Sequence, residues 1–414
     1  MAVSIPTGAA AGKPPGPVIL LADQEATMDF ALTESQELIK KEVGALARTF
    51  SLDYWLAKDD KPEYPSEFVK AFADNGWLGI LVPEEYGGAG LGVTEAALML
   101  HEICASGAGT SGASPIHFYV FPPTPLIKYG TEAMKRKYLP EICSGEIVMA
   151  FGVTEPNAGT DTSRIQTRAE KKGGHWVVNG RQVWTTNAQH ATKILLLART
   201  ADRDPAKPLK GMTLFFADFD RKAITVREIH KLGRAAVDSN EIFIDNLEIP
   251  EEDVVGTPGE GFYHLIDSLN PERIVVGIEA VGIGRAALER AVQYAKERVV
   301  FDRPIGKNQA IAHPLAHAMA QLDAAEMMCL KAAWLFDNGK PCGREANAAK
   351  MLAAEAGFNA CDAALQTFGG FGYAKEFYVE RLWREIRLYK IAPVSQQMAL
   401  NYLAEHVLGL PRSY

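Results

Sequence analysis

The hydrophobic and polar positions of the 414-residue chain change their period twice along the sequence. From about residue 30 to residue 147, the apolar positions follow the 3.6-residue period of amphipathic helices. Thr33–Gln36 (TESQ) has the form of a capping box and opens the first of them. The segments Leu98–Cys104 and Met134–Ile142 continue the pattern. We therefore expect an N-terminal helical domain over residues 30–147.

Short apolar runs of the kind that forms strands replace this pattern between about residues 148 and 258. Three of these runs are Ile194–Ala198, Met212–Ala217 and Glu241–Ile244. The pair Asn179-Gly180 lies between His175–Val178 and Arg181–Trp184 and predicts a hairpin with a type I′ turn. Because a succession of short strands is typical of a small barrel or sandwich, we expect a middle β domain over residues 148–258.

Long helical patterns return from about residue 259 to residue 414. They are Arg273–Arg298, Gln309–Asp337, Glu345–Thr367 and roughly Ser395–Leu408. Most are apolar on one face, and a helical bundle is their natural packing. The fold class predicted is α+β and mostly α: an N-terminal helical domain, a small middle β-barrel or sandwich, and a C-terminal four-helix bundle over residues 259–414. Residues 1–29 are rich in Ala, Gly and Pro, which predicts a disordered N-terminal extension.

Composition narrows the class of protein without naming a function. The net charge of −8 argues against a nucleic-acid surface, which would usually be basic. No apolar run reaches the length that crosses a bilayer, so no membrane partner is expected. The short run Val18–Ala22 is too small for a signal-peptide core, no Arg precedes Arg48, and Pro411–Tyr414 is not a peroxisomal signal. We therefore expect a cytoplasmic location.

The cysteines predict neither disulfides nor a metal site. Their number is odd, and none are paired as C-x-x-C. We interpret them as reduced thiols, and no Cys or His cluster has the spacing of metal ligands. They are Cys104, Cys143, Cys329, Cys342 and Cys361.

The most informative motif is the segment Phe151–Asp161 (FGVTEPNAGTD). Its small residues, free backbone N–H groups and Thr hydroxyls let a flat polar ligand approach closely. About 23 residues later, Trp184–Asn187 (WTTN) offers a large rigid aromatic face for such a ligand. At these residues the chain resembles the acyl-CoA dehydrogenase family of flavoproteins, whose fingerprint is Val/Leu-Thr-Glu-Pro-x-Ala-Gly-Ser/Thr-Asp.

The resemblance extends from about residue 30 to residue 408. The further stretches that match, in order, are Pro83–Gly88 (PEEYGG), Trp184–Asn187, Glu297–Phe301 (ERVVF) with Gln309, and Gln366–Gly372 (QTFGGFG). The family holds FAD between the β domain and the helical bundle, so the resemblance implies FAD as the cofactor. A Rossmann-type site is not expected, because no G-x-G-x-x-G follows a strand and no Walker A motif is present.

The resemblance implies three groups of FAD-binding residues. Those of the fingerprint turn, which would bond to the flavin ring and the pyrophosphate, are Val153, Thr154, Gly159 and Thr160. Those beside the isoalloxazine are Trp184 and Thr186. Those that would reach the adenine and pyrophosphate of FAD in a neighbouring subunit are Arg298, Phe301, Gln309, Gln366 and Gly370. The last group implies a homo-oligomer, usually a tetramer in this family.

Simpler interpretations of single residues stay open. Trp184 at the end of a strand is compatible with a core position, Arg298 with a solvated helix C-terminus, and Gly369-Gly370 with a helix C-cap. None of the nine histidines has a recognisable Ser or Cys nucleophile beside it, so we interpret them, His117 included, as surface or core residues. The aromatic run His117–Pro123 lies where relatives line the acyl pocket; it either narrows that pocket or is core.

The family removes the α-proton of an acyl-CoA thioester and transfers the β-hydride to the flavin, which gives an enoyl-CoA. Most relatives carry the base as the Glu of Tyr-Glu-Gly-Thr before the last helix. This chain reads Ile391–Gln396 (IAPVSQ), with Ala392 in place of the Glu and Pro393 in place of the Gly. Because no carboxylate lies between Arg387 and Tyr402, the usual base is missing.

A minority of relatives place the base in a Glu-Arg pair at the start of the first bundle helix. Glu272 is therefore the candidate catalytic base, with Arg273 beside it and Thr160 near the thioester as substrate-binding residues. The alternative is structural: Asn270 as N-cap and Pro271 at the first helical position would favour a Glu here through the helix dipole alone.

Three functions stay open. One is an FAD-dependent acyl-CoA dehydrogenase that passes electrons to electron-transfer flavoprotein or another protein acceptor. The second is a flavin-dependent oxidase or monooxygenase on the same fold that reacts with O₂. The third is a catalytically silent flavoprotein that serves as a binding subunit.

Overall fold

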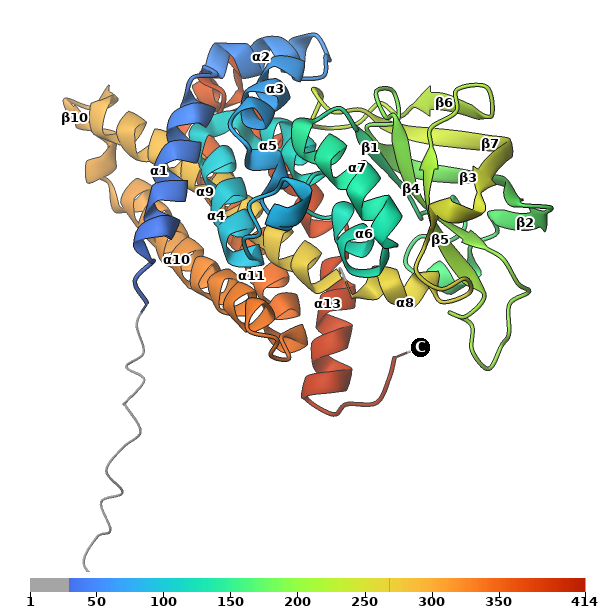
Figure 1. Ribbon diagram of the computed structural model, residues 1–414. Helices are drawn as coiled ribbons and strands as arrows, with labels where there is room; N and C mark the ends of the chain where they lie inside the picture. Colours follow the sequence, from blue (N-terminus) through green and yellow to red (C-terminus); the bar gives the residue numbers. More distant parts are fainter. Residues whose placement is uncertain (1–29, 268, 414) are drawn as a thin grey trace, which may run out of the picture.

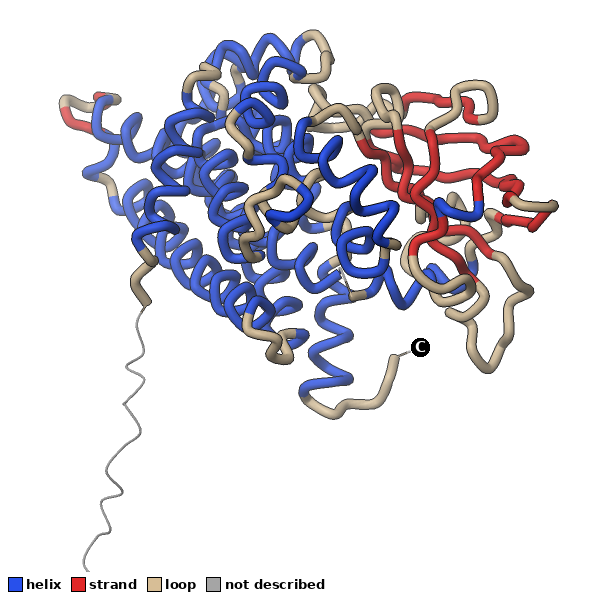
Figure 2. The backbone as a smooth tube through the Cα atoms, in the orientation of Figure 1, coloured by secondary structure: helices blue, strands red, loops and turns tan. Residues whose placement is uncertain are grey.

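The computed structural model describes residues 30–267 and 269–413 (Figure 1). The extension predicted over residues 1–29 lies outside the described residues. Figure 2 shows helices gathered on one side of the molecule and strands on the other. Helices, then a sheet, then helices follow one another along the chain, which confirms the predicted fold class.

The N-terminal part is helical because its apolar positions recur on one face of each segment. Its helices are α1 (Glu34–Arg48), α2 (Leu52–Asp60), α3 (Ser66–Asp74), α4 (Val93–Ile103), α5 (Gly109–His117), α6 (Pro123–Tyr129) and α7 (Glu132–Ser144). The predicted capping box is present, since the Thr33 side chain accepts from the Gln36 N–H and the Gln36 side chain accepts from the Thr33 N–H.

Eight strands form one hydrogen-bonded sheet, the middle part of the chain. They are β1 (Met149–Gly152), β2 (Arg168–Lys172), β3 (His175–Thr186), β4 (Lys193–Arg199), β5 (Met212–Asp218), β6 (Ile224–Glu228), β7 (Ser239–Pro250) and β8 (Val254–Val255). The order is β6-β7-β3-β2-β4-β5-β8, and β1 pairs in parallel with β4. Every residue of β4 is buried, so this strand lies at the centre of the domain.

The hairpin predicted at Asn179-Gly180 is wrong. Both residues lie inside the twelve-residue strand β3, and the turn is at Gly173-Gly174, between β2 and β3. Gly173 has a φ of +62°, which glycine adopts without steric cost. Gly180 instead allows a close approach, because a Cβ there would lie 2.3 Å from the Thr167 hydroxyl oxygen.

The C-terminal part is built on long helices. Its elements are α8 (Gly261–Ile266), α9 (Leu269–Glu297), the two-residue strands β9 (Val299–Val300) and β10 (Arg303–Pro304), α10 (Gln309–Asp337), α11 (Gly343–Phe368), α12 (Val379–Ile386) and α13 (Gln396–Tyr402). The long helix predicted from Ser395 is α13 followed by a π-helical turn, Leu403–Val407, and the Ser395 side chain caps it.

Helix α9 is the central element of the helical part. It packs against α4, α10 and α11, and most of its residues are buried. In Figure 1 its C-terminal end leads to β10, at the opposite side of the molecule from the sheet. Its N-terminal end therefore lies toward the sheet and its other end far from it.

Three observations bear on the class of protein. No helix in the described residues combines the length and hydropathy that crossing a membrane requires. Within residues 30–267 and 269–413, no group of His, Cys, Asp and Glu side chains has the arrangement of a metal site. All the cysteines predicted to be reduced are free.

Candidate active site

The fingerprint turn follows β1, and Glu155 within it stabilises its conformation. The Glu155 carboxylate is buried and accepts hydrogen bonds of 2.7 Å from the Gln166 N–H and 2.6 Å from the Thr167 N–H. The Thr154 carbonyl accepts from the Val183 N–H at 2.8 Å, so the turn runs beside β3. A Cβ on Gly159 would meet no atom within 4 Å, which leaves the turn open to a ligand.

The end of β3 presents an aromatic face and several unpaired polar atoms. Trp184 has a φ of +64°, and its side chain is 58% exposed. A tryptophan so exposed is not a core residue, which removes the simpler interpretation of Trp184. Among the described residues, the buried atoms Thr185 Oγ1, Asn187 Oδ1 and Arg234 Nε have no hydrogen-bond partner. Since buried polar atoms are normally paired, these atoms are available to a polar ligand at the end of β3.

Arg234 brings a positive charge to the end of β3, and no sequence motif indicated it. Its guanidinium donates to Ser239 Oγ at 2.8 Å, to Thr186 Oγ1 at 3.2 Å and to Ser114 Oγ at 3.4 Å. Burial lowers its pKa, with opposing effects from nearby acidic groups that include Glu279. An arginine remains charged in proteins, so a half-buried cation lies beside Thr186.

Glu272 lies in the first turn of α9, in a buried cluster of titratable side chains. Its Oε2 is 2.7 Å from His117 Nε2, and the other ring nitrogen, Nδ1, is 2.8 Å from Glu279 Oε1. The Tyr389 hydroxyl donates to Glu279 Oε2 at 2.6 Å. All these residues are less than 10% exposed. We call this set, Glu272, His117, Glu279 and Tyr389, the carboxylate cluster.

The charge state of His117 follows from its neighbours. Burial alone would lower the pKa of its imidazole, but the two carboxylates outweigh burial and raise the pKa well above its usual range. Tyr389 keeps its proton, because burial and the adjacent Glu279 raise the pKa of its phenol. Of the two interpretations of His117, surface or core, the structure supports the core position, and it adds a contact with the candidate base.

The Arg273 side chain does not pair with Glu272 but turns back onto its own helix. Its guanidinium donates to the Leu269 carbonyl at 3.1 Å and to Asn270 Oδ1 at 3.2 Å. Burial lowers its pKa, and among the described residues its Nε has no partner. Asn270 is not the N-cap that the structural alternative assumed, because α9 already includes Leu269.

Two short paths connect the carboxylate cluster to the fingerprint. Ser114, which binds Arg234, precedes His117 by three residues on α5, and residues three apart share a helix face. On the other side, the centroid of the Phe121 ring lies 5.2 Å from that of the Phe151 ring and 6.3 Å from that of the His117 ring. The fingerprint turn, the end of β3 and Glu272 therefore surround one region at the junction of sheet and helices.

The other predicted FAD residues lie at the far end of the helical part. Arg298, Phe301 and Gly370 line a groove of about 540 Å³. Phe301 is 92% exposed, and the Arg298 guanidinium lies 5.7 Å from the Phe371 ring centroid. Gly369 ends α11 with a φ of +60°, so the C-cap interpretation of the Gly369-Gly370 pair is correct.

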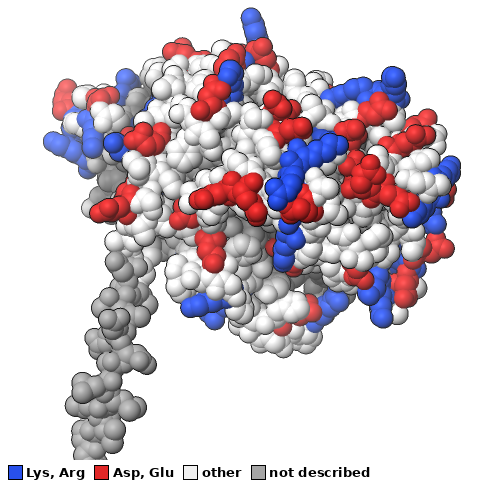
Figure 3. Space-filling model, in the orientation of Figure 1, with Lys and Arg blue, Asp and Glu red and all other residues white. Residues whose placement is uncertain are grey.

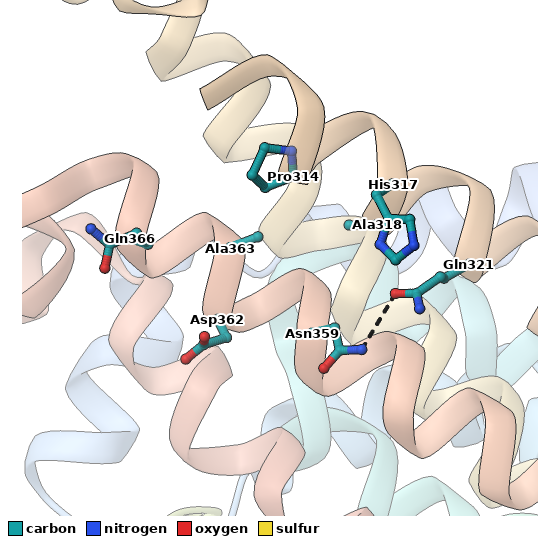
Figure 4. A pocket seen from close by; sticks show the side chains of 8 residues that line it. All are labelled: Pro314, His317, Ala318, Gln321, Asn359, Asp362, Ala363 and Gln366. Atoms are coloured by element: carbon teal, nitrogen blue, oxygen red, sulfur yellow. Dashed lines mark hydrogen bonds between the residues drawn. The ribbon is translucent and has the colours of Figure 1, made fainter. Parts of the chain in front are cut away.

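Gln366 lines a neighbouring groove between α10 and α11 (Figure 4). This groove holds about 310 Å³, and Asn359 Nδ2 donates to Gln321 Oε1 at 3.3 Å across it. Gln309 is exposed as the first residue of α10. Since β10 and the sheet lie on opposite sides in Figure 1, one chain does not bring these residues to Trp184.

Comparison with known proteins shows the family. The models for the N-terminal, middle and C-terminal domains of acyl-CoA dehydrogenases match residues 33–146, 150–247 and 259–408. Acyl-CoA dehydrogenase FadE12 of Mycobacterium tuberculosis is 36% identical over 391 residues, which cover 93% of this chain and 99% of that protein.

Two solved structures agree with this. Glutaryl-coenzyme A dehydrogenase in complex with glutaryl-CoA superposes with a TM-score of 0.88 at 30% identity, over 93% of this chain and 98% of that one. Butyryl-CoA dehydrogenase from Megasphaera elsdenii superposes with a TM-score of 0.87 at 31% identity, over 92% of this chain and 100% of that one. The chain belongs to the acyl-CoA dehydrogenase family, FAD-dependent oxidoreductases that act on CH–CH bonds.

Proposed function

We propose that the protein dehydrogenates an acyl-CoA thioester at the α and β carbons, with Glu272 as the base that removes the α-proton. The observation that supports this most is the state of the Glu272 carboxylate. His117 fixes Oε2, whereas Oε1 has no hydrogen bond to any described residue. One oxygen is thus held and the other is free to receive a proton, as a general base requires.

The unpaired atoms around Trp184 fit FAD, whose chemistry at this site is to accept a hydride from the β-carbon. The Trp184 ring would lie against the isoalloxazine, with Thr186 as a hydrogen-bond donor to it. Val153, Thr154, Gly159 and Thr160 would supply the bonds from the fingerprint turn. Arg273 and Thr160 remain the proposed substrate-binding residues.

We propose a homotetramer in which the groove of Arg298, Phe301 and Gly370, with Gln309 and Gln366, binds the adenine end of a neighbour's FAD. The support is the separation of this groove from Trp184 within one chain. Light scattering of the purified protein tests the assembly. The electron acceptor is proposed to be an electron-transfer flavoprotein, with O₂ as the alternative. The cytoplasmic location stays a prediction.

The oxidase or monooxygenase alternative is retained for one reason. The segment between Arg387 and Tyr402 carries no carboxylate, so the family's usual base position is empty in this sequence. If Glu272 were not a base, loss of general-base catalysis would cost a factor of about 10²–10⁴, and proton abstraction would be an unsuitable chemistry for this site.

The test is anaerobic mixing of the FAD-loaded protein with a panel of saturated acyl-CoAs, followed by flavin absorbance. We expect one or more thioesters to bleach the flavin and Glu272→Gln to slow bleaching by about 10²-fold or more. The matched control is Glu289→Gln, an exposed carboxylate on the same helix. If no thioester bleaches the flavin but O₂ is consumed with another compound, the oxidase alternative is correct.

A further inference from the structure

The carboxylate cluster contains an arrangement that the proposed base alone does not require. Both ring nitrogens of His117 meet carboxylate oxygens, at 2.7 and 2.8 Å. An ionised carboxylate only accepts hydrogen bonds, so both ring nitrogens must donate if both glutamates are ionised. His117 is then an imidazolium, and the ring with its two carboxylates carries a net charge of −1.

The two carboxylates are not equivalent. Glu279 uses both oxygens, one for His117 and one for the Tyr389 hydroxyl. Glu272 uses Oε2 alone, and Oε1 has no hydrogen bond within the described residues. A carboxylate with both oxygens hydrogen-bonded is held as a fixed charge, whereas one with a free oxygen can take up a proton. Glu279 therefore suits the role of counter-ion, and Glu272 suits that of proton acceptor.

We propose that His117 is a positioning residue that aims the Glu272 carboxylate, and that Glu279 is the permanent counter-ion of the His117 imidazolium. This rests on the proposed function, because it takes Glu272 as the group that removes the α-proton. In that step an O–H bond forms at Glu272 Oε1 and the α C–H bond breaks. The electron pair of that bond becomes the new C=C bond, and the β-hydride leaves to the cofactor.

The benefit of Glu279 appears once Glu272 is protonated. Glu272 is then neutral, and the imidazolium would be a buried cation without a counter-charge if Glu279 were absent. Leaving one partner of a buried ion pair unpaired is strongly destabilising. With Glu279 in place, the His117–Glu279 pair remains intact throughout the proton transfer.

Other titratable groups face the two carboxylates, and their states are compatible with this role. Arg273 on α9 interacts with Glu272, and Arg234 interacts with Glu279. Cys104 directly follows α4, and burial together with the charge of Glu279 raises the pKa of its thiol well above the usual range. Tyr389 also stays protonated. His117 is thus the group in direct contact with both carboxylates that carries a mobile proton.

The first test reads the protonation of His117 without any turnover. The FAD-loaded protein is labelled with ¹⁵N-histidine, and the His117 signals are assigned from their loss in His117→Gln. We expect both ring nitrogens to be protonated from pH 6 to pH 9, and one proton to be lost within this range in Glu279→Gln. A wild-type His117 with one unprotonated ring nitrogen at pH 7 overturns the inference.

The second test measures the pH dependence of flavin reduction by the most active acyl-CoA. In His117→Gln we expect the rate to fall about 10²-fold, as for a misplaced reacting group, and the rising limb of the profile to move to higher pH. Glu279→Gln should also slow flavin reduction, because it removes the counter-ion that holds the His117 ring in position. The control is His406→Gln, whose side chain is 56% exposed.

The outcomes separate the two proposals. If Glu272→Gln reduces its flavin at the wild-type rate, the proposed base is wrong, and the NMR result still decides whether His117 is an imidazolium. If Glu272→Gln is slow while His117→Gln and Glu279→Gln keep the wild-type rate and pH profile, the base stands and the positioning role is overturned. Because His117→Gln removes the cation shared by two buried carboxylates, Glu279→Gln serves as the second variant if the first does not fold.

Discussion

Lys350 donates a hydrogen bond of 2.6 Å to the backbone carbonyl oxygen of Tyr389. The lysine side chain is fully buried in α11, and the hydroxyl of the same tyrosine binds Glu279. Tyr389 is therefore held at its backbone and at its ring. The segment Arg387–Lys390, which directly precedes the usual position of the base at Ala392, is therefore fixed beside the carboxylate cluster.

Burial lowers the pKa of Lys350 to about 8, with a further contribution from the charge of Arg273. At a pH below the unfolded-state pKa, a lysine whose pKa is lower in the folded protein favours the unfolded chain, because the unfolded chain holds the proton more tightly. Stability should therefore rise with pH between about 8 and the ordinary lysine value of about 10.4. Below pH 8 the cost of this one group is at most about 3 kcal/mol.

Replacing Lys350 by Met isolates this contribution. We expect the stability of Lys350→Met relative to the wild type to be higher at pH 7 than at pH 10, measured by urea unfolding at each pH. The loss of the bond to Tyr389 is common to both conditions and cancels. Lys296→Met, an exposed lysine on α9, should show no such pH dependence. A difference independent of pH would show that Lys350 is charged in the folded protein.

Glu155 should matter for stability as well as for FAD. Glu155→Gln replaces one of the two acceptor oxygens by an NH₂ group. This group cannot accept a hydrogen bond from the backbone N–H of Gln166 or Thr167 that it faces. A buried donor left unpaired costs about 1–3 kcal/mol. We expect a loss of this size in urea unfolding of the FAD-free protein and weaker FAD binding by the loosened turn. The exposed Glu170→Gln on β2 is the control, and equal losses in the two variants would contradict the role of Glu155.

Periodicity was enough to locate the long C-terminal helices and the first helix, whereas short helices such as α12 (Val379–Ile386) were not predicted. α10 spans Gln309–Asp337, the range predicted from its pattern, and Thr33 caps α1 as its capping box indicates. The prediction of a hairpin at Asn179-Gly180 was wrong because Gly180 has another role. The Thr167 side chain packs so close to it that only glycine fits, and the sequence does not show this contact. Two successive glycines at 173 and 174 were the stronger turn signal.

The candidate site was only partly readable from the sequence. The fingerprint and Trp184 could be recognised because their residue types lie together in the chain. His117 could not, because its carboxylate partners are 155 and 162 residues away. The same holds for Arg234, whose role depends on Ser114 and Thr186 from other elements. A signal was present in the seven-residue spacing of Glu272 and Glu279, which places both carboxylates on one face of a helix.

Trp184 should contribute to FAD affinity through its ring. Stacking of a planar heterocycle on an aromatic side chain is worth about 1–3 kcal/mol, or about 5- to 150-fold in affinity. We expect Trp184→Ala to raise the FAD dissociation constant by a factor in this range, measured by flavin fluorescence during reconstitution. Trp184→Phe should retain most of the affinity. Because Ala and Phe meet the same backbone strain at a φ of +64°, their difference reports the ring. Equal affinities for both variants would place the flavin elsewhere.

Gly109 should be required for the placement of α5, and through it of His117. Its φ is +62°, and a Cβ there would lie 2.3 Å from Glu385 Oε2. That carboxylate accepts from the Thr110 N–H at 2.7 Å and is paired with the buried Arg381, so it cannot move aside without breaking a buried ion pair. Gly369 has a similar backbone conformation, with a φ of +60°, but no atom within 4 Å of its Cβ position. We expect Gly369→Ala to cost about 1–3 kcal/mol from backbone strain, whereas Gly109→Ala should cost at least about 3 kcal/mol more from the clash and the broken pair. Urea unfolding of both variants measures the difference, and similar losses would mean that the Glu385 contact does not fix the start of α5.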